Sequence, residues 1–139
     1  MTGVQTCALP IYSIQVDGFH HSGNPIPAAS RVGSLVATGG VYGLDPETGI
    51  VAETAEDQVR LTFWQLGRIL EKAGGSFDDV AKMTFYVASA DLKPLINKYW
   101  LMEFTDEQSR PARHTLMYNS LPGDIVIQCD ALAFVSSHE

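Results

Sequence analysis

The amino-acid sequence predicts an α+β domain in which two helices pack on one face of a mixed β-sheet. Segments with strand and helix periodicity follow in the order strands, helix, strand, helix and two strands. The chain has 139 residues, which suits a single domain. Its hydrophobic residues make up 45% and its charged residues 18%, so the composition supports a buried core and argues against disorder.

The N-terminal part reads as short strands separated by loops. Residues 13–16 alternate between apolar and polar, and residues 17–28 contain two prolines and two adjacent histidines typical of a loop. Residues 30–38 are predicted to form one strand, which the pair Gly39-Gly40 interrupts by allowing a bulge or a close backbone approach. We expect His20 and His21 to be solvated loop residues, since neighbouring side chains on an extended backbone point apart and would not share a metal.

The first helix is the clearest element, and we expect it over residues 54–73. Thr54 is a suitable N-cap, and Gly74-Gly75 supplies a stop. Phe63, Leu66 and Leu70 recur at helical spacing and should face the sheet. A strand is expected over residues 79–88. A second helix should begin near Asp91, with Pro94 tolerated only in its first turn.

The last two strands, within residues 110–133, are predicted to join through a Leu-Pro-Gly-Asp turn. Arg113 opens the first of them, and Gln128 and Asp130 share one face of the second. Because a guanidinium matches a carboxylate with two parallel hydrogen bonds, these side chains could form the floor of a carboxylate pocket. The alternative is that Arg113 makes an ordinary ion pair with Asp130 or Asp124.

The second face of the predicted sheet is too apolar to be left bare. It carries Tyr86, Val126, Leu132 and Phe134. A contiguous apolar surface of this kind indicates self-association.

Charge and cysteine usage narrow the classes of function. The net charge of −7 argues against nucleic acid as the main partner, and no run of about 18 apolar residues suggests a membrane span. Residues 1–11 resemble the translation of a DNA sequencing adapter. We expect them to be a non-native leader, with residues 12–139 forming the domain. Cys129 is then the only native cysteine, and with no disulfide framework or metal-type Cys/His spacing the sequence suits the cytoplasm.

Several ordered segments together resemble the Rid family (YjgF-like, reactive intermediate deaminases). The segments that carry the resemblance are Gly33-Ser-Leu-Val-Ala-Thr-Gly-Gly40, Leu44-Asp-Pro-Glu-Thr-Gly49, Val80-Ala-Lys-Met-Thr-Phe-Tyr-Val87, Ile96-Asn-Lys-Tyr99, Pro111-Ala-Arg113 and Leu121-Pro122. The resemblance implies a chorismate-mutase-like protomer and a homotrimer whose sheets line a central barrel. It also implies active sites in clefts between subunits, and hydrolysis of small 2-imino or 2-enamino acids to 2-keto acids and ammonia without a cofactor or metal.

The resemblance also suggests site residues. Arg113 matches the arginine that holds the substrate carboxylate, Asn97 matches a pocket-lining asparagine, and Thr115 stands where a cysteine is common. Three further pocket positions depart from the family pattern, with Ile26 replacing a tyrosine, Gly39 a serine and Gln128 the glutamate thought to activate water.

The exchange at Gln128 leaves the function open between two main hypotheses. A glutamine amide forms hydrogen bonds but cannot take up a proton as a carboxylate does. Asp130 lies two residues further on the same strand face and is a weak candidate to take over. The chain is therefore expected to be a Rid-type deaminase or, alternatively, a non-catalytic or altered-substrate binder of small carboxylates such as 2-keto acids. Ribonuclease activity or translation inhibition fits the acidic composition least.

Overall fold

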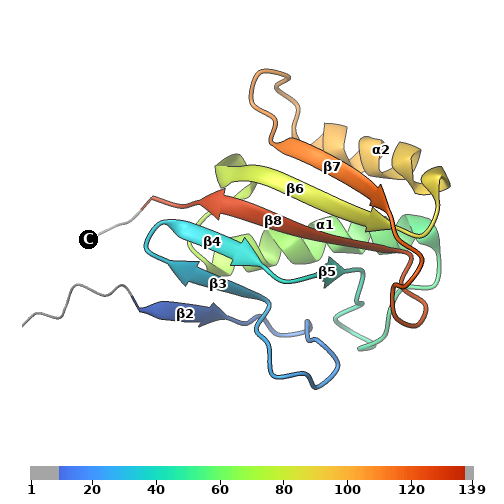
Figure 1. The fold of residues 1–139 in the computed structure, drawn as a ribbon, viewed down its shortest axis with the longest axis horizontal. Helices are drawn as coiled ribbons and strands as arrows, with labels where there is room; N and C mark the ends of the chain where they lie inside the picture. The colour runs from blue at the N-terminus through green and yellow to red at the C-terminus, as the bar shows by residue number, and fades with distance from the viewer. Residues whose placement is uncertain (1–9, 137–139) are drawn as a thin grey trace, which may run out of the picture.

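The structure, a computed structural model, describes residues 10–136, and its core is one mixed sheet covered by two α-helices (Figure 1). The expectation of a leader over residues 1–11 falls almost wholly outside the described residues. The elements, in chain order, are β2 (Ile11–Ile14), β3 (Ala29–Val32), β4 (Leu35–Thr38), β5 (Val41–Tyr42), α1 (Ala55–Lys72), the 3₁₀ turn η1 (Phe77–Asp79), β6 (Val80–Val87), the 3₁₀ turn η2 (Ala90–Leu92), α2 (Lys93–Glu103), β7 (Ala112–Met117) and β8 (Ile127–Phe134).

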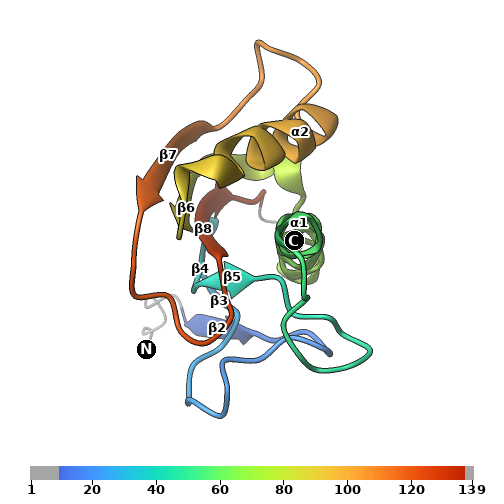
Figure 2. The ribbon, with the colours of Figure 1, turned by 90° about the vertical axis from the view of Figure 1, so that its right-hand side faces the viewer.

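The described strands form one seven-stranded sheet with the order β2-β3-β4-β8-β6-β7, and β5 also pairs with β8. The pairs are antiparallel except for β6 and β7, which run parallel. Both helices lie on the same side of the sheet (Figure 2). The predicted α+β class, with two helices on one face of a mixed sheet, is therefore confirmed.

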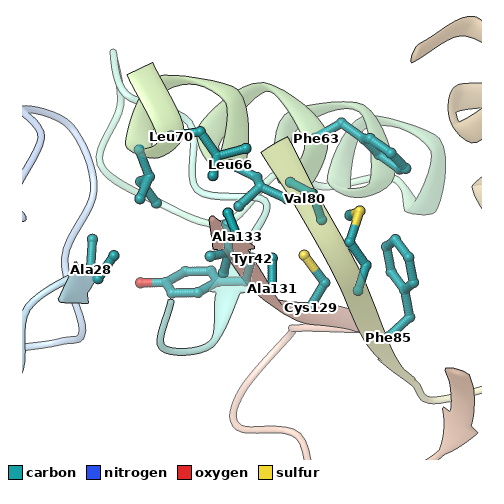
Figure 3. Close-up of a cluster of buried hydrophobic side chains, with 14 of the residues drawn as sticks. Ala28, Tyr42, Phe63, Leu66, Leu70, Val80, Phe85, Cys129, Ala131 and Ala133 are labelled. Atoms are coloured by element: carbon teal, nitrogen blue, oxygen red, sulfur yellow. The ribbon is translucent and has the colours of Figure 1, made fainter. Parts of the chain in front are cut away.

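The core lies between α1 and the central strands. Thr54 caps α1 by accepting a hydrogen bond from the Asp57 backbone N–H, and Leu66 and Leu70 have no exposed surface. In Figure 3 these leucines project from α1 toward Ala131 and Ala133 of β8. The alternation of β8 places every second residue in this layer, as the sequence predicts.

The predicted hairpin of the last two strands is wrong. Strand β6 lies between β7 and β8 and pairs with both, so the loop after β7 carries the chain past the end of β6. The turn at Pro122 exists, since the Ile125 N–H donates to its carbonyl at 3.2 Å. A local turn reverses the chain direction without deciding which strand becomes the neighbour.

The single strand predicted over residues 30–38 is also wrong. The structure has two antiparallel strands there, β3 and β4, in which Val32 pairs with Leu35. Gly33 makes this tight turn with a φ of 58°, a backbone region that favours glycine. The β-branched and apolar residues on either side concealed the turn in the sequence.

The face of the sheet opposite the helices, which we call the open face, exposes large apolar side chains. Val32, Leu35 and Phe134 are cross-strand neighbours there, and Leu132 lies two residues from Phe134 on β8. These four side chains are 37–61% exposed. The open face therefore has the apolar character predicted for it. No helix among residues 10–136 is long and apolar enough to cross a membrane.

Replacing Leu66 by alanine should lower the free energy of unfolding by about 2–5 kcal/mol, because the cavity lies in the layer between α1 and the sheet. The matched control is Leu101→Ala on α2, where the leucine is 53% exposed, and this change should cost far less. Chemical denaturation of both variants measures the difference. Equal losses would contradict this description of the core.

A second prediction concerns the contact between the two helices and its dependence on pH. The Glu56 carboxylate of α1 accepts hydrogen bonds from the Lys98 ammonium and, at 2.7 Å, from the Tyr99 hydroxyl of α2. Hydrogen bonds from Lys98 and then Tyr99 hold the pKa of Glu56 below its ordinary value. A carboxyl group with a lower pKa in the folded state stabilises the fold above its unfolded pKa, and this contribution is lost as the pH falls.

Denaturation of the wild type and of Glu56→Gln from neutral to acid pH should therefore give stability curves that converge as the pH falls. The measurement is the difference in unfolding free energy at each pH. A difference that stays constant down to the acid limit would show that the charge of Glu56 contributes nothing.

Candidate functional site

Arg113 is the predicted site residue that carries a positive charge, and it lies on β7 at the edge of the sheet. Its Nη2 donates to Asn97 Oδ1 of α2 at 2.8 Å, and its Nε donates to Thr115 Oγ1 at 3.1 Å. The guanidinium carbon also lies 5.0 Å from the centre of the Trp100 ring. These contacts bring Arg113, Asn97 and Thr115 together, and we call them the arginine half-site.

The arginine half-site holds its cation without neutralising it. Both hydrogen-bond acceptors of Arg113 are neutral oxygen atoms, and partial burial lowers the pKa of the guanidinium. An arginine side chain nevertheless stays charged in proteins. The ion pairs found among residues 10–136 are Arg60–Asp57 and Lys98–Glu56, so the expected alternative of an Arg113 pair with Asp130 or Asp124 is wrong. The other N–H groups of this half-buried guanidinium have no hydrogen-bond partner within residues 10–136, which suits it to bind an anion.

The register of the sheet places Arg113 and Gln128 on opposite faces. Arg113 pairs with Met83 of β6, which has no exposed surface and belongs to the helix side. Gln128 pairs with Tyr86, which lies three residues after Met83 on β6 and therefore on the other face. Paired residues on neighbouring strands point to the same side of a sheet, and successive residues along one strand point to opposite sides. The sheet therefore lies between the Arg113 and Gln128 side chains. The prediction that Arg113, Gln128 and Asp130 share one pocket floor is therefore wrong within a single chain.

Gln128 forms the centre of a second group of residues, the glutamine half-site, with Gly39 and Gly40. A Cβ atom added to Gly40 would lie 2.6 Å from Gln128 Cδ, so the glycine is what allows the amide to lie flat against the backbone. Gly39-Gly40 was predicted to permit such a close approach, and this is confirmed. Gln128 is half-buried, and its amide makes no hydrogen bond within the described part of the chain.

Asp130 lies two residues beyond Gln128 on the same face. Its carboxylate accepts a hydrogen bond from the Tyr86 hydroxyl at 3.1 Å. Burial first, and then the charge of Asp130, raises the pKa of Tyr86, so the phenol keeps its proton and remains the donor. Ile26, the remaining predicted site residue, is 51% exposed in the loop between β2 and β3.

Two buried glutamines of α1 fix the loops around the glutamine half-site. Gln58 donates to the Ala52 and Asp124 carbonyls and accepts from the Val126 N–H, which anchors the segment leading into β8. Gln65 donates to the Gly18 carbonyl at 3.0 Å and to the Leu44 carbonyl, shortly after β5, at 2.8 Å. Both side chains are at most 2% exposed, so these bonds are shielded from water.

Sequence reasoning missed two residues of these half-sites. Trp100 supplies the ring beneath the Arg113 guanidinium, and its position three residues after Asn97 on α2 was an available signal. His21 was expected to be solvated, which is wrong, because its Nε2 bonds the Gly40 carbonyl at 2.8 Å. Nothing in the local pattern distinguishes it from His20, which is exposed.

A large cavity in the structure does not coincide with either half-site. It has a volume of about 910 Å³ and lies between the loops at residues 49–53 and 122–126, and its lining includes neither Arg113 nor Gln128. Among residues 10–136, no three His, Cys, Asp or Glu side chains gather in a way that could hold a metal ion. The described chain therefore has a charged arginine on one face of the sheet and a glutamine amide on the other.

Comparison with known proteins identifies the fold and its lineage. The family described as Endoribonuclease L-PSP matches residues 22–135, which is most of the chain and includes both half-sites. The chain belongs to the Rid/YjgF family. The resemblance inferred from the sequence motifs is thereby confirmed.

Individual relatives of this Rid protein agree with that assignment. It is 32% identical over 111 residues to a RutC family protein of Pyrococcus abyssi, covering 79% of this chain and 86% of the relative. It is 33% identical over 103 residues to the 2-iminobutanoate/2-iminopropanoate deaminase of Salmonella typhimurium, covering 73% and 80% of the two chains. The crystal structure of Escherichia coli TdcF with bound serine aligns with a TM-score of 0.81 at 27% identity, covering 90% of this chain and 99% of that one.

Proposed function

We propose that this Rid protein hydrolyses imines of small 2-amino acids to 2-keto acids and ammonia, at sites shared between copies of the chain. The observation that carries the proposal is the arginine half-site, a guanidinium held by two neutral oxygen atoms with N–H groups left for an anion. A carboxylate matches such a fork with two parallel hydrogen bonds. The deaminase name of the Salmonella relative supports the same substrate class.

The shared site follows from the separation of the two half-sites. Since the sheet lies between Arg113 and Gln128 within one chain, a ligand can touch both only if a second copy presents its Gln128 to the first copy's Arg113. The apolar open face supplies a surface for that association, because four large side chains there are exposed. We propose that three copies assemble with their open faces toward a common centre, as the family resemblance implies.

In the proposed reaction, Arg113 binds the carboxylate and fixes the imine carbon at the seam between two copies. The partner's glutamine half-site holds a water molecule, which the Gln128 amide oxygen orients by accepting a hydrogen bond. Water adds to the C=N carbon and one of its protons passes to nitrogen, which gives a carbinolamine. The hydroxyl proton then passes to nitrogen as the C–N bond breaks, releasing ammonia and leaving the oxygen as the keto group. No step requires a cofactor, and the proposed compartment is the cytoplasm.

A second candidate function is binding without turnover, and the identity of Gln128 favours it. The amide can donate to a keto oxygen as readily as it accepts from water, but it cannot take up a proton. Asp130 already accepts the Tyr86 hydroxyl and lies a full pleat away along β8. On this alternative the shared site holds a 2-keto acid or another small carboxylate.

The test is the release of 2-ketobutyrate from 2-iminobutyrate generated in situ by a threonine dehydratase, with titration calorimetry of 2-ketobutyrate in parallel. The enzyme hypothesis expects ketoacid release above the buffer rate and its loss in Arg113→Ala. Binding that depends on Arg113 without faster release would support the binder. If the protein neither releases ketoacid faster than buffer nor binds 2-ketobutyrate, both hypotheses are contradicted.

A further inference from the structure

The glutamine half-site is built around a break in the strand between β4 and β5, where two consecutive carbonyls are bonded by side chains. The Gly39 carbonyl accepts from the Thr38 hydroxyl at 2.9 Å, and the Gly40 carbonyl accepts from His21 Nε2 at 2.8 Å. Thr38 belongs to β4 itself, whereas His21 reaches across from the loop between β2 and β3. His21 is therefore the external support of this backbone.

The break has little rigidity of its own. A glycine lacks the Cβ that restricts φ and ψ, so the orientation of each peptide group at Gly39-Gly40 depends on its hydrogen bonds. The Gly39 N–H is held by the Ala28 carbonyl at 2.9 Å. The peptide group after Gly40 carries the carbonyl that His21 binds, and the Gln128 amide packs on the same glycine. The imidazole and the amide thus act on one residue from two directions.

The loop holds His21 firmly in that position. Phe19 is 5% exposed and meets the imidazole edge to face, with 5.2 Å between the ring centres. Gln65 of α1 fixes the start of the same loop through the Gly18 carbonyl. The Tyr42 hydroxyl donates to the His20 carbonyl and closes the loop against β5. The adjacent His20 side chain is exposed, and its Nδ1 accepts a hydrogen bond from the Ser22 N–H at 3.2 Å instead of bonding Gly40.

While Nε2 of His21 bonds the Gly40 carbonyl, the other ring nitrogen, Nδ1, has no partner among residues 10–136. A carbonyl only accepts, so Nε2 carries the proton and Nδ1 is an acceptor. Among residues 10–136, Nδ1 is the one buried side-chain nitrogen or oxygen found without a hydrogen-bond partner. A buried polar atom without a partner calls for an explanation, and the bond to Gly40 provides one here.

We propose that His21 is a positioning residue of the shared site, which orients the Gly40 peptide so that Gln128 is held ready for water or the ligand. The inference rests on the proposed function, because it gives that site the residue that aligns its glutamine half. His21 does not touch the substrate on this account. Its effect should fall on turnover and leave carboxylate binding, which Arg113 provides from the other copy, largely intact.

The test compares three variants in the ketoacid-release assay. His21→Ala removes the donor and should lower kcat about tenfold with a nearly unchanged KM, as loss of one aligning hydrogen bond implies. His21→Gln places an amide N–H near the position of Nε2 and should restore most of the rate. His20→Ala is the matched control and should behave as the wild type. An unchanged kcat in His21→Ala, or no rescue by glutamine, would overturn the proposal.

A second readout does not depend on activity. In ¹⁵N-labelled protein, His21→Ala should shift and broaden the side-chain amide signals of Gln128, while His21→Gln and His20→Ala leave them near their wild-type positions. If the wild type neither hydrolyses imines nor binds 2-ketobutyrate, the proposed function fails, and this spectrum still decides the role of His21. Unmoved Gln128 signals in His21→Ala would refute that role whatever the activity.

Discussion

Replacing Arg113 by alanine should weaken binding of 2-ketobutyrate about 100-fold and reduce ketoacid release to the buffer rate. The change removes both hydrogen bonds of the guanidinium to the ligand carboxylate, and bonds to charged groups are individually worth about 1.5–3 kcal/mol. It also leaves the carboxylate against Trp100 and Asn97, neither of which carries a charge. Titration calorimetry measures the affinity, and the assay described above measures the rate.

Two further variants distinguish the contribution of the two parallel N–H groups of the Arg113 guanidinium from that of its positive charge. Arg113→Lys keeps the positive charge but cannot present two parallel N–H groups, so it should recover only part of the affinity. Arg60→Ala removes an arginine of a half-exposed ion pair on α1 and serves as the control for net charge. Full activity in Arg113→Ala, with an unchanged melting temperature, would exclude the arginine half-site as the carboxylate site.

Replacing Gln128 by glutamate should raise the rate of imine hydrolysis by about 10²-fold or more. Glutamate has the same shape, so it can occupy the same place against Gly40, and its carboxylate can take a proton from water as the amide cannot. General acid–base assistance is typically worth about 10²–10⁴ in rate. The kcat of the two proteins in the ketoacid-release assay gives the comparison.

The controls for this prediction test Asp130 as the replacement for the missing glutamate. If Asp130 supplies the base in the wild type, Asp130→Asn should abolish release and Gln128→Glu should add little. If it does not, Asp130→Asn should leave the rate near the wild type and Gln128→Glu should show the full gain. A Gln128→Glu protein slower than the wild type would contradict the assignment of this position to water activation.

The sequence predicted well those features that depend on local periodicity. Helix α1 has its cap at Thr54 and its buried stripe at Leu66 and Leu70, as predicted. An apolar stripe at helical spacing can be recognised from the local sequence alone. The alternation of β8 was equally clear. The family motifs also brought Arg113, Asn97 and Thr115 together correctly, and the hydrogen bonds among them follow from that placement.

What the sequence did not reveal depends on pairings between distant segments. The insertion of β6 between β7 and β8 is a non-local choice, and the turn at Pro122 is compatible with a hairpin or a crossing. The register of β6 with each of these strands, which is equally non-local, places Arg113 and Gln128 on opposite faces. His21 gave no local signal, since its function depends on reaching a carbonyl 19 residues away.

The most direct test of the shared site is complementation between two inactive variants. Arg113→Ala and Gln128→Leu each damage one half-site and should be inactive alone, while each retains the other half-site. Co-expressed with different tags and purified through both, they form mixed assemblies. Purification through both tags removes the unmixed rings, and in a closed ring of three that contains both variants about one third of the seams pair an intact arginine with an intact glutamine. Ketoacid release, or 2-ketobutyrate binding if turnover is absent, should return to about that fraction of the wild type. Mixed assemblies as inactive as their parents would show that no site is formed by Arg113 of one chain and Gln128 of another.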